Sequence, residues 1–536
     1  MIIHWKKNFL FGAYLIFNVL LSALLLYFDY GYLIVALFVV GGHMRDLINV
    51  VHQLCNMRKI LRIIPDIADE EINTICCLVP VYNEDAALLK KNLDSLTTQK
   101  LSTNTKVVVL LLFDGLGEHN TDLFDSIVCL LEFDTDCGKE VWYQNWKSKE
   151  DTKLEYFIGM YNHTTVILSH KENNLGKKDS LIIGEKFITT EIPDISALGI
   201  PKVDFIYHTD GDTASDEHCL NEMLKSLVDD KNLDGISGLL RTYLKDDASC
   251  TERGFVMMQD FQYFFSLIVR RMTESLLNAT TCLPGCSNMI RIGTRTDVAI
   301  EKYGNLPAQE SSLVQTITRM QGTDRRYTTL LLRQGSNLQM NWRAFVRTEP
   351  PLNAKSLIDQ RRRWSSNSFF NSMVVLYTSN IPLYIRAATL VDIGRVFSTL
   401  FRFISYFCFW IYITNFSITN IVFLSLVIVL PYLYAFGWIF CVVPEWKQMI
   451  VGFFLNKIFM PFLAVIAVSK MFLTATKFSW GSVVTTETTE TPSLVSPQPF
   501  SSSVEAVPKV PKHKSLETDK DCIFFCENPK LNHSEQ

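Results

Sequence analysis

The chain has 536 residues, of which 48% are hydrophobic, and its formal net charge is −4 at pH 7. This length allows more than one domain, and the slightly acidic balance argues against nucleic-acid binding. Both ends of the main body are apolar and aromatic, whereas the middle, from about Met57 to Asn353, has the mixed composition of a soluble domain. We therefore expect a membrane protein with one large aqueous domain inserted between its membrane-spanning segments.

The first apolar run, from about Asn8 to Tyr27, is long enough to cross a bilayer. A second run follows from about Tyr32 toward Val51, and basic residues stand before the first run (Lys6, Lys7) and after the second (Met57–Arg62). Positive charge marks the cytoplasmic side of membrane segments, so this pattern predicts a hairpin with the central domain in the cytosol.

Four apolar runs in the central region have the length and composition of buried strands. They cover Thr74–Val81, Lys106–Phe113, Thr164–Ser169 and Phe205–Thr209, and helical patterns lie between them. Such alternation predicts an α/β domain with a mostly parallel sheet. Ligands bind beyond the carboxyl ends of strands in these sheets, and four carboxylates stand there: Glu84, Asp114, Asp210 and Asp212.

The remainder of the chain is mainly helical or polar in pattern. The expected elements are an amphipathic helix at Gln259–Leu277, an interfacial helix at Phe369–Tyr384, and spans near Phe397–Thr414, Ile418–Val442 and Met449–Phe472. A glycosylation sequon at Asn415 would face outward between two spans. From about Val484 the chain becomes rich in Thr, Ser, Pro and Glu, which predicts a disordered tail.

The thiols and charged motifs each allow an ordinary structural explanation. The 13 cysteines are scattered without a zinc spacing, which favours reduced thiols. Asp210-Gly211-Asp212 could hold a divalent cation, but Asp also caps helices, and on its own the cap is favoured. The basic loop at Lys177 could contact phosphates or be a solvated helix start. Asp324 could be a base or a cap, and Gln360–Trp364 could hold a phosphorylated sugar or lie on anionic lipid.

Together these segments resemble the chitin synthases, within the processive family 2 glycosyltransferases. The resemblance rests on segments in the family's order, namely Cys77–Glu84, Gly176–Ser180, Asp210–Thr213, Cys282–Cys286, Thr323–Arg325 and Gln360–Trp364, with a further element at Phe478–Gly481. The Gln-Arg-Arg-Arg-Trp form and the Cys-Leu-Pro-Gly-Cys turn are specific to chitin synthases. Hyaluronan and cellulose synthases share the carboxylates and a looser Gln-x-x-Arg-Trp motif.

The resemblance implies a GT-A-like domain that binds UDP-GlcNAc. The residues implied at the UDP site are Tyr82, Glu84, Asp114, Lys177, Lys178, Asp210, Arg361, Arg362 and Arg363. Asp212 would bind the Mg²⁺ or Mn²⁺ ion that bridges the UDP phosphates. Asp324 would be the general base that deprotonates the acceptor's 4-hydroxyl group for an inverting attack. Trp364 would stack on the acceptor sugar, and Gln360 would lie beside it.

The resemblance implies a protein that extends a chitin chain and passes it across the bilayer. It would be a multi-pass protein of the plasma membrane, with its catalytic domain in the cytosol. The expected regions are residues 1–56 (membrane hairpin), 57–366 (glycosyltransferase domain), 367–392 (interfacial region), 393–482 (membrane region) and 483–536 (polar tail). The resemblance is also compatible with a homo-oligomeric protein. The sequence departs from the family pattern at two positions: Thr323 stands where the family commonly has Glu, and Gly211 stands where it commonly has Ala. The alternatives are a hyaluronan synthase and an inactive membrane scaffold, the latter favoured only by Thr323.

Overall fold

The computed structural model describes residues 2–27, 31–67, 72–102, 104–131, 138–189, 199–306, 312–320, 322–412 and 417–475. All of them belong to one compact unit, Met1–Trp480. The sequon at Asn415, the Phe478–Gly481 element and the polar tail lie outside the described residues. The regional boundaries expected from the sequence remain predictions.

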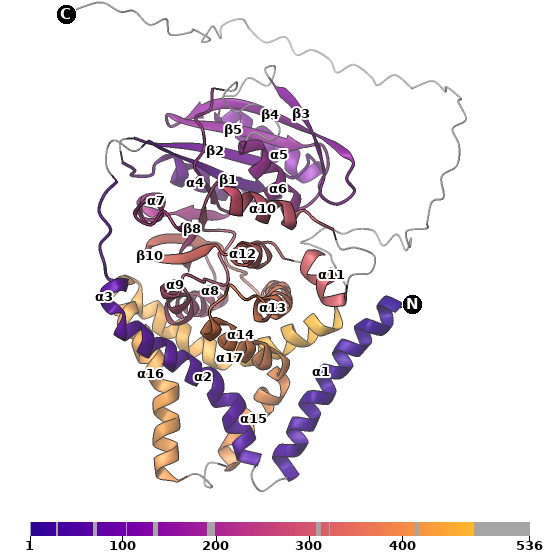
Figure 1. The fold of residues 1–536 in the computed structure, drawn as a ribbon, viewed down its shortest axis with the longest axis vertical. Coiled ribbons are helices and arrows are strands. Elements are labelled where there is room, and N and C mark those ends of the chain that lie inside the picture. The colour runs from indigo at the N-terminus through magenta and orange to yellow at the C-terminus, as the bar shows by residue number, and fades with distance from the viewer. Residues whose placement is uncertain are drawn as a thin grey trace, which may run out of the picture. The chain divides into compact units, whose positions relative to one another are not determined.

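Within the described residues, the strands form one ten-stranded sheet (Figure 1). Its strand order is β3-β4-β5-β2-β1-β6-β9-β8-β10-β7. In chain order the strands are β1 (Asn73–Val81), β2 (Thr105–Phe113), β3 (Lys139–Gln144), β4 (Asp151–Tyr161), β5 (Thr164–Lys171), β6 (Phe205–His208), β7 (Thr213–Ser215), β8 (Leu233–Thr242), β9 (Asn288–Arg291) and β10 (Asn337–Thr348). The four predicted strands are confirmed as β1, β2, β5 and β6.

The sheet is mixed, and the expectation of a mostly parallel sheet is wrong for the sheet as a whole. The four neighbours β5, β2, β1 and β6 are parallel, as is the β8–β10 pair. The other pairs are antiparallel, including β9 with both β6 and β8. The expectation held only where each strand is buried on both faces, because such strands are continuous apolar runs that can be recognised locally.

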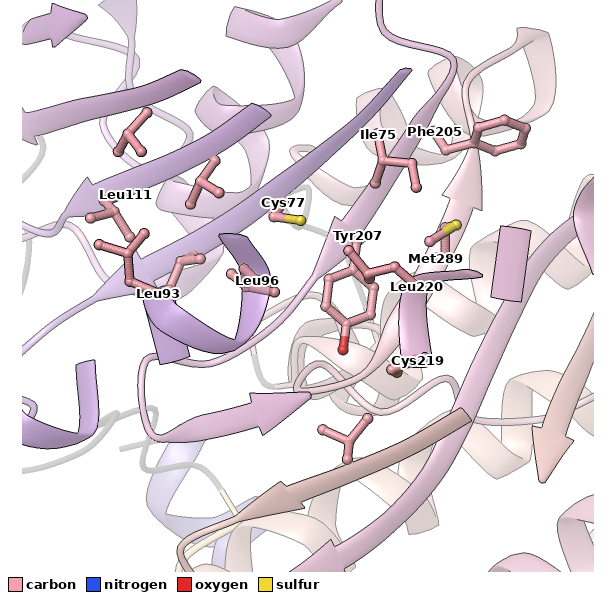
Figure 2. Close-up of a cluster of buried hydrophobic side chains, with 14 of the residues drawn as sticks. Ile75, Cys77, Leu93, Leu96, Leu111, Phe205, Tyr207, Cys219, Leu220 and Met289 are labelled. Atoms are coloured by element: carbon pink, nitrogen blue, oxygen red, sulfur yellow. The ribbon is translucent and has the colours of Figure 1, made fainter. Parts of the chain in front are cut away.

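Helices cover both faces of the parallel strands, and alternate residues of β1 serve the two faces. Ile75 and Cys77 face a cluster with α4 (Ala86–Thr97), α5 (Glu118–Leu131) and α7 (Cys219–Asp229). Figure 2 shows part of this cluster, with Leu93 and Leu96 of α4 beside the strands. Leu78 faces α6 (Lys177–Ile188), where a Cβ at Gly184 would lie only 2.5 Å from Leu78 Cδ1. Glycine therefore brings α6 close to the strand.

The second half of the unit adds helices beside β8, β9 and β10. They are α8 (Cys250–Phe265), a π-helix (Ser266–Arg271), α9 (Met272–Leu276), α10 (Thr294–Tyr303), α11 (Leu313–Met320), α12 (Asp324–Arg333), α13 (Ala354–Leu376) and α14 (Leu383–Phe397). The helix expected at Gln259–Leu277 is confirmed, with a π-helical stretch inside it. The single helix expected at Phe369–Tyr384 is wrong, since α13 ends at Leu376 and α14 begins after Pro382, whose ring disfavours a helix interior.

The apolar helices are α1 (Ile2–Tyr27), α2 (Gly31–Cys55), α15 (Thr399–Tyr412), α16 (Ile418–Val442) and α17 (Trp446–Leu473), with the short α3 (Met57–Ile60) after α2. Within the described residues, α16 and α17 are long and apolar enough to cross a membrane, and Phe9–Leu25 forms a shorter apolar segment. In Figure 1, α16 extends away from the sheet while α17 runs beneath α8 and α13. A Cβ at Gly452 of α17 would lie 2.1 Å from the Met257 carbonyl oxygen of α8, so these helices are in close contact.

Candidate active site

Three carboxylates gather where β1 and β6 end. Glu84 lies against the Asp210–Asp212 turn, because a Cβ added at Gly211 would be 3.1 Å from Glu84 Cγ. The Tyr82 backbone N–H donates to the Glu84 carboxylate, while the Tyr82 side chain stays 39% exposed. Asp212 Oδ1 accepts hydrogen bonds from the hydroxyl groups of Thr213 (3.1 Å) and Thr348 (3.3 Å). The strand ends therefore converge as the sequence predicts.

Burial and the neighbouring carboxylates disfavour the charged forms of Glu84 and Asp212. Burial raises the pKa of Glu84 to about 8, and the carboxylates of Asp212 and Asp210 act in the same direction. Burial and Asp210 raise the pKa of Asp212 to about 6. A divalent cation would relieve this repulsion. The described residues contain no group of three His, Cys, Asp or Glu side chains poised for a metal, but Mg²⁺ commonly uses one or two carboxylates together with substrate phosphates. Asp212 fits that mode of binding.

The two adjacent lysines at the start of α6 have different surroundings. The Lys177 ammonium group forms an ion pair with Asp210. Burial acts to lower the pKa of Lys177, but the carboxylates of Asp210 and Asp324 outweigh it and raise this pKa. Lys178 Nζ instead lies 4.0 Å from the Trp146 ring centroid and donates to the Arg319 carbonyl oxygen at 2.8 Å. The structure thus brings Lys177, and not the ammonium group of Lys178, to the carboxylates.

Asp114 at the end of β2 is engaged inside the protein. Its Oδ1 atom lies 2.6 Å from Lys171 Nζ and accepts a hydrogen bond from the Leu175 backbone N–H at 2.9 Å. Gly115 has φ +82°, and a Cβ there would lie 2.6 Å from the Asn174 nitrogen. Asp114 therefore supports the loop that leads into α6 and Lys177. A direct contact of Asp114 with uridine remains a prediction.

Asp324 is the first residue of α12, and its carboxylate acts on the same Lys177 ammonium group as that of Asp210. The Thr323 hydroxyl group donates to Asp324 Oδ1, so the threonine that departs from the family pattern orients this carboxylate. A Cβ at Gly285 would lie 2.5 Å from Asp324 Oδ1. Burial raises the pKa of the neighbouring Cys286 thiol, and the carboxylates of Asp210, Asp324 and Asp212 raise it further. The Cys282–Cys286 turn thus lies against Asp324 and close to Asp210 and Asp212.

The two arginines after Asp324 face different surroundings. Burial lowers the pKa of Arg325, and the Arg271 guanidinium lowers it further. Burial lowers the pKa of Arg326 to about 10, and the charges of Arg333 and Arg319 also act to lower it. The first turn of α12 therefore places one carboxylate near the Lys177 ammonium group and two guanidinium groups near other arginines.

The Gln360–Trp364 segment lies on α13. The Arg361 guanidinium carbon is 4.5 Å from the Trp364 ring centroid and 5.3 Å from that of Tyr263. Arg361 Nε and Nη2 and Gln360 Oε1 are buried without a hydrogen-bond partner in the described part of the chain. Trp364 is 43% exposed.

Arg362 and Arg363 have surroundings that differ from those of Arg361. Arg362 Nη1 donates to the Thr474 hydroxyl group at 3.3 Å, at the end of α17. Burial lowers the pKa of Arg363, and the Arg362 charge adds to this effect. Arg361 is therefore the arginine of this segment that presents unpaired donors.

Three features of the site have no local signal in the sequence. Gly285 stands in a turn that is uninformative by itself, and only the fold places it against Asp324. Tyr263 is part of an amphipathic helix, with no local sign that its ring meets Arg361. Thr323 is recognisable as a departure from the family pattern, but the sequence does not indicate its hydrogen bond to Asp324.

A family model described as chitin synthase matches residues 159–504, more than half of the chain. Chitin synthase 8 of Verticillium dahliae is 23% identical over 372 residues, which cover 61% of this chain and 61% of the relative. Chitin synthase 8 of Gibberella zeae is 24% identical over 443 residues, which cover 75% of this chain and 65% of the relative. The chain thus spans less than two-thirds of the length of these relatives. A solved mannosyltransferase from Pyrobaculum calidifontis, in complex with GDP-Man and Mn²⁺, has a TM-score of 0.46 and 13% identity over 82% of this chain and 97% of its own.

Proposed function

Because this chain belongs to the chitin synthase family, we propose that it transfers N-acetylglucosamine from UDP-GlcNAc to the 4-hydroxyl group of a growing β-1,4 chain. The observation that carries the proposal is the convergence of Asp324 with the Lys177–Asp210 pair, since both carboxylates act on the Lys177 ammonium group. A base and a donor-binding site must lie close together for a sugar to move from one substrate to the other.

The donor side has partners for a diphosphate. The buried, unpaired Nε and Nη2 atoms of Arg361 form the kind of planar fork that binds phosphate oxygens, and Arg362 and Arg363 add positive charge on the same helix turn. Asp212 would hold Mg²⁺ or Mn²⁺, which would supply positive charge to the leaving diphosphate, and Asp210 would lie at the sugar or ribose side of UDP. We further propose that Tyr82, Glu84 and Asp114 line the uridine side, where Asp114 supports the loop before Lys177.

The acceptor side has a base and an aromatic platform. In the proposed reaction, an Asp324 carboxylate oxygen takes the proton of the acceptor 4-hydroxyl group. The hydroxyl oxygen forms a bond to the anomeric carbon while the bond from that carbon to the phosphate oxygen breaks, and the electron pair leaves with UDP. Attack from the side opposite UDP inverts the anomeric configuration. Trp364 is 43% exposed, and the acceptor sugar would stack on its ring, next to Gln360.

We also propose that the protein is a multi-pass protein of the plasma membrane, with its catalytic domain on the cytosolic side. The polymer would cross the bilayer as it grows. The apolar helices α16 and α17 support membrane insertion, and the basic residues around the N-terminal hairpin support this orientation. Processive extension follows if the acceptor stays on Trp364 between transfers.

The test is incubation of the purified protein with UDP-GlcNAc and Mg²⁺ or Mn²⁺, with UDP release and chitinase-sensitive polymer as readouts. Polymer from this single donor, lost in Asp324→Asn, is the expected result. Polymer that appears only after UDP-glucuronate is added would identify a hyaluronan synthase instead. Folded protein that releases no UDP under any condition would overturn the enzymatic proposal in favour of a scaffold.

A further inference from the structure

One buried carboxylate contacts both elements that carry the proposed reaction. Glu185 lies on α6, two turns after Lys177, and is 5% exposed. Its Oε2 atom accepts a hydrogen bond from the Tyr327 hydroxyl group at 2.9 Å. Its Oε1 atom lies 3.1 Å from His208 Nε2, although the two atoms are not aligned for a hydrogen bond. Glu185 therefore touches α12 on one side and β6 on the other.

Both partners of Glu185 lie close in sequence to residues of the candidate site. Tyr327 stands one helical turn after Asp324, so the two side chains share one face of α12. His208 is the last residue of β6, directly before the segment that carries Asp210 and Asp212. The Tyr327 and His208 rings also meet, with centroids 6.2 Å apart. Glu185 thus links α12, which carries Asp324, to β6, which leads into Asp210 and Asp212.

A second chain of contacts leads from the same histidine to the same base. His208 Nδ1 lies 2.9 Å from Asn288 Oδ1, and Asn288 Nδ2 donates to the Pro284 carbonyl oxygen at 2.7 Å. Pro284 precedes Gly285, which packs directly against the Asp324 carboxylate. Two routes therefore join β6 to Asp324, and His208 belongs to both.

We propose that Glu185 is a positioning residue, which fixes the placement of Asp324 relative to Asp210 and Asp212 by binding Tyr327 and His208. This inference rests on the proposed function, because it assumes that Asp324 acts on an acceptor. A buried carboxylate is a poor way to stabilise a fold, since apolar residues of similar volume often do as well or better. It is an effective way to hold two elements in one geometry, and misplacement of a catalytic group by about 1 Å can reduce the rate about 100-fold.

The test uses variants that break this link and one that does not. Tyr327→Phe removes the hydroxyl group that binds Glu185, and Glu185→Ala removes the carboxylate. Glu185→Gln keeps an oxygen that can accept the Tyr327 hydrogen bond. The matched control is Tyr303→Phe, because Tyr303 is 1% exposed, packs on Tyr327 at 5.6 Å, and has a hydroxyl group with no hydrogen-bond partner among the described residues.

We expect Tyr327→Phe and Glu185→Ala to lower kcat for polymer formation about tenfold, with KM for UDP-GlcNAc and Kd for UDP changed less than twofold. Glu185→Gln should stay within about threefold of wild type, and the double variant Glu185→Ala/Tyr327→Phe should be no slower than Glu185→Ala. These figures follow from the loss of one charge-assisted hydrogen bond. Tyr303→Phe should match wild type in all of these measurements.

A readout without turnover separates this inference from the proposed function. Hydrogen–deuterium exchange should show faster exchange at the start of α12 in Tyr327→Phe, but not in Tyr303→Phe, with β6 unchanged. Unchanged exchange in α12, or wild-type kcat in Tyr327→Phe, would overturn the positioning role. Equal losses in kcat and UDP affinity would also overturn it, because they indicate general damage. If wild type makes no polymer, the proposed function fails, and the exchange result still decides whether Glu185 orders α12.

Discussion

Asparagine at position 212 should make the ligand-free protein more stable while it removes activity. Burial and the nearby Asp210 carboxylate raise the pKa of Asp212 from 3.8 to about 6. A carboxyl group with a higher pKa in the folded state binds its proton more tightly when the protein is folded. As the pH rises from about 4 to about 6, this proton is lost, and the resulting negative charge destabilises the fold. At ~1.36 kcal/mol for each tenfold change in proton affinity, the cost is at most about 3 kcal/mol above pH 7 and vanishes below about pH 4.

The substitution suits this test because the local hydrogen bonds can be kept. Asp212 Oδ1 accepts from the hydroxyl groups of Thr213 (3.1 Å) and Thr348 (3.3 Å), and an amide oxygen can accept the same two bonds. Asp212→Asn should therefore remove the charge with little change of shape. The matched control is Asp216→Asn, which makes the same charge change at an exposed position four residues later.

The assay is thermal melting of the detergent-solubilised protein without nucleotide or metal, at pH 8 and at pH 4.5. At roughly 2 °C per kcal/mol, Asp212→Asn should raise Tm by ~6 °C or less at pH 8, with a smaller gain at pH 4.5. Asp216→Asn should show no gain. UDP with Mn²⁺ should raise the Tm of wild type more than that of Asp212→Asn. A variant that melts below wild type at pH 8, or gains equally at both pH values, would refute the reasoning.

Two further substitutions test the acceptor and donor sides. Gly285→Ala should lower kcat at least tenfold with UDP affinity unchanged, because its Cβ would lie 2.5 Å from Asp324 Oδ1. Steady-state UDP release and calorimetry measure the two quantities, and a wild-type kcat would contradict the placement of Asp324. Arg361→Lys should raise KM for UDP-GlcNAc about tenfold or more, because lysine lacks the planar fork of donors. The exposed Arg253→Lys serves as its control, and an unchanged KM in Arg361→Lys would exclude a diphosphate contact.

The parallel strands β1, β2, β5 and β6 could be predicted from the sequence, whereas the parallel pair β8–β10 and the antiparallel strands could not. All nine residues of β1 are buried, so β1 is a continuous apolar run with a clear local signal. β9 is only four residues long and pairs with β6 and β8, which precede it by many residues. Such pairing depends on contacts between distant segments, and no local pattern records it.

The candidate site could be predicted where the chain places a side chain at the end of a strand. Glu84 and the Asp210–Asp212 turn meet for this reason. Helical residues were harder, because neighbours on a helix point about 100° apart and a motif does not reveal which one faces the site. Lys177 meets Asp210, but Lys178 packs on Trp146, although the two lysines look equivalent in the sequence.

The first turn of α12 limits how the length of the chain can change during evolution. Asp324 acts on the Lys177 ammonium group, whereas Arg325 and Arg326 lie near other arginines, and the preceding Gly322 has φ +85° and touches Asn367. Loss of one residue from this turn would rotate the following side chains by about 100°. It would bring a guanidinium group to the place of the carboxylate. A single-codon deletion here should therefore be as damaging as replacement of Asp324 itself, while deletions in surface loops far from the site should be tolerated.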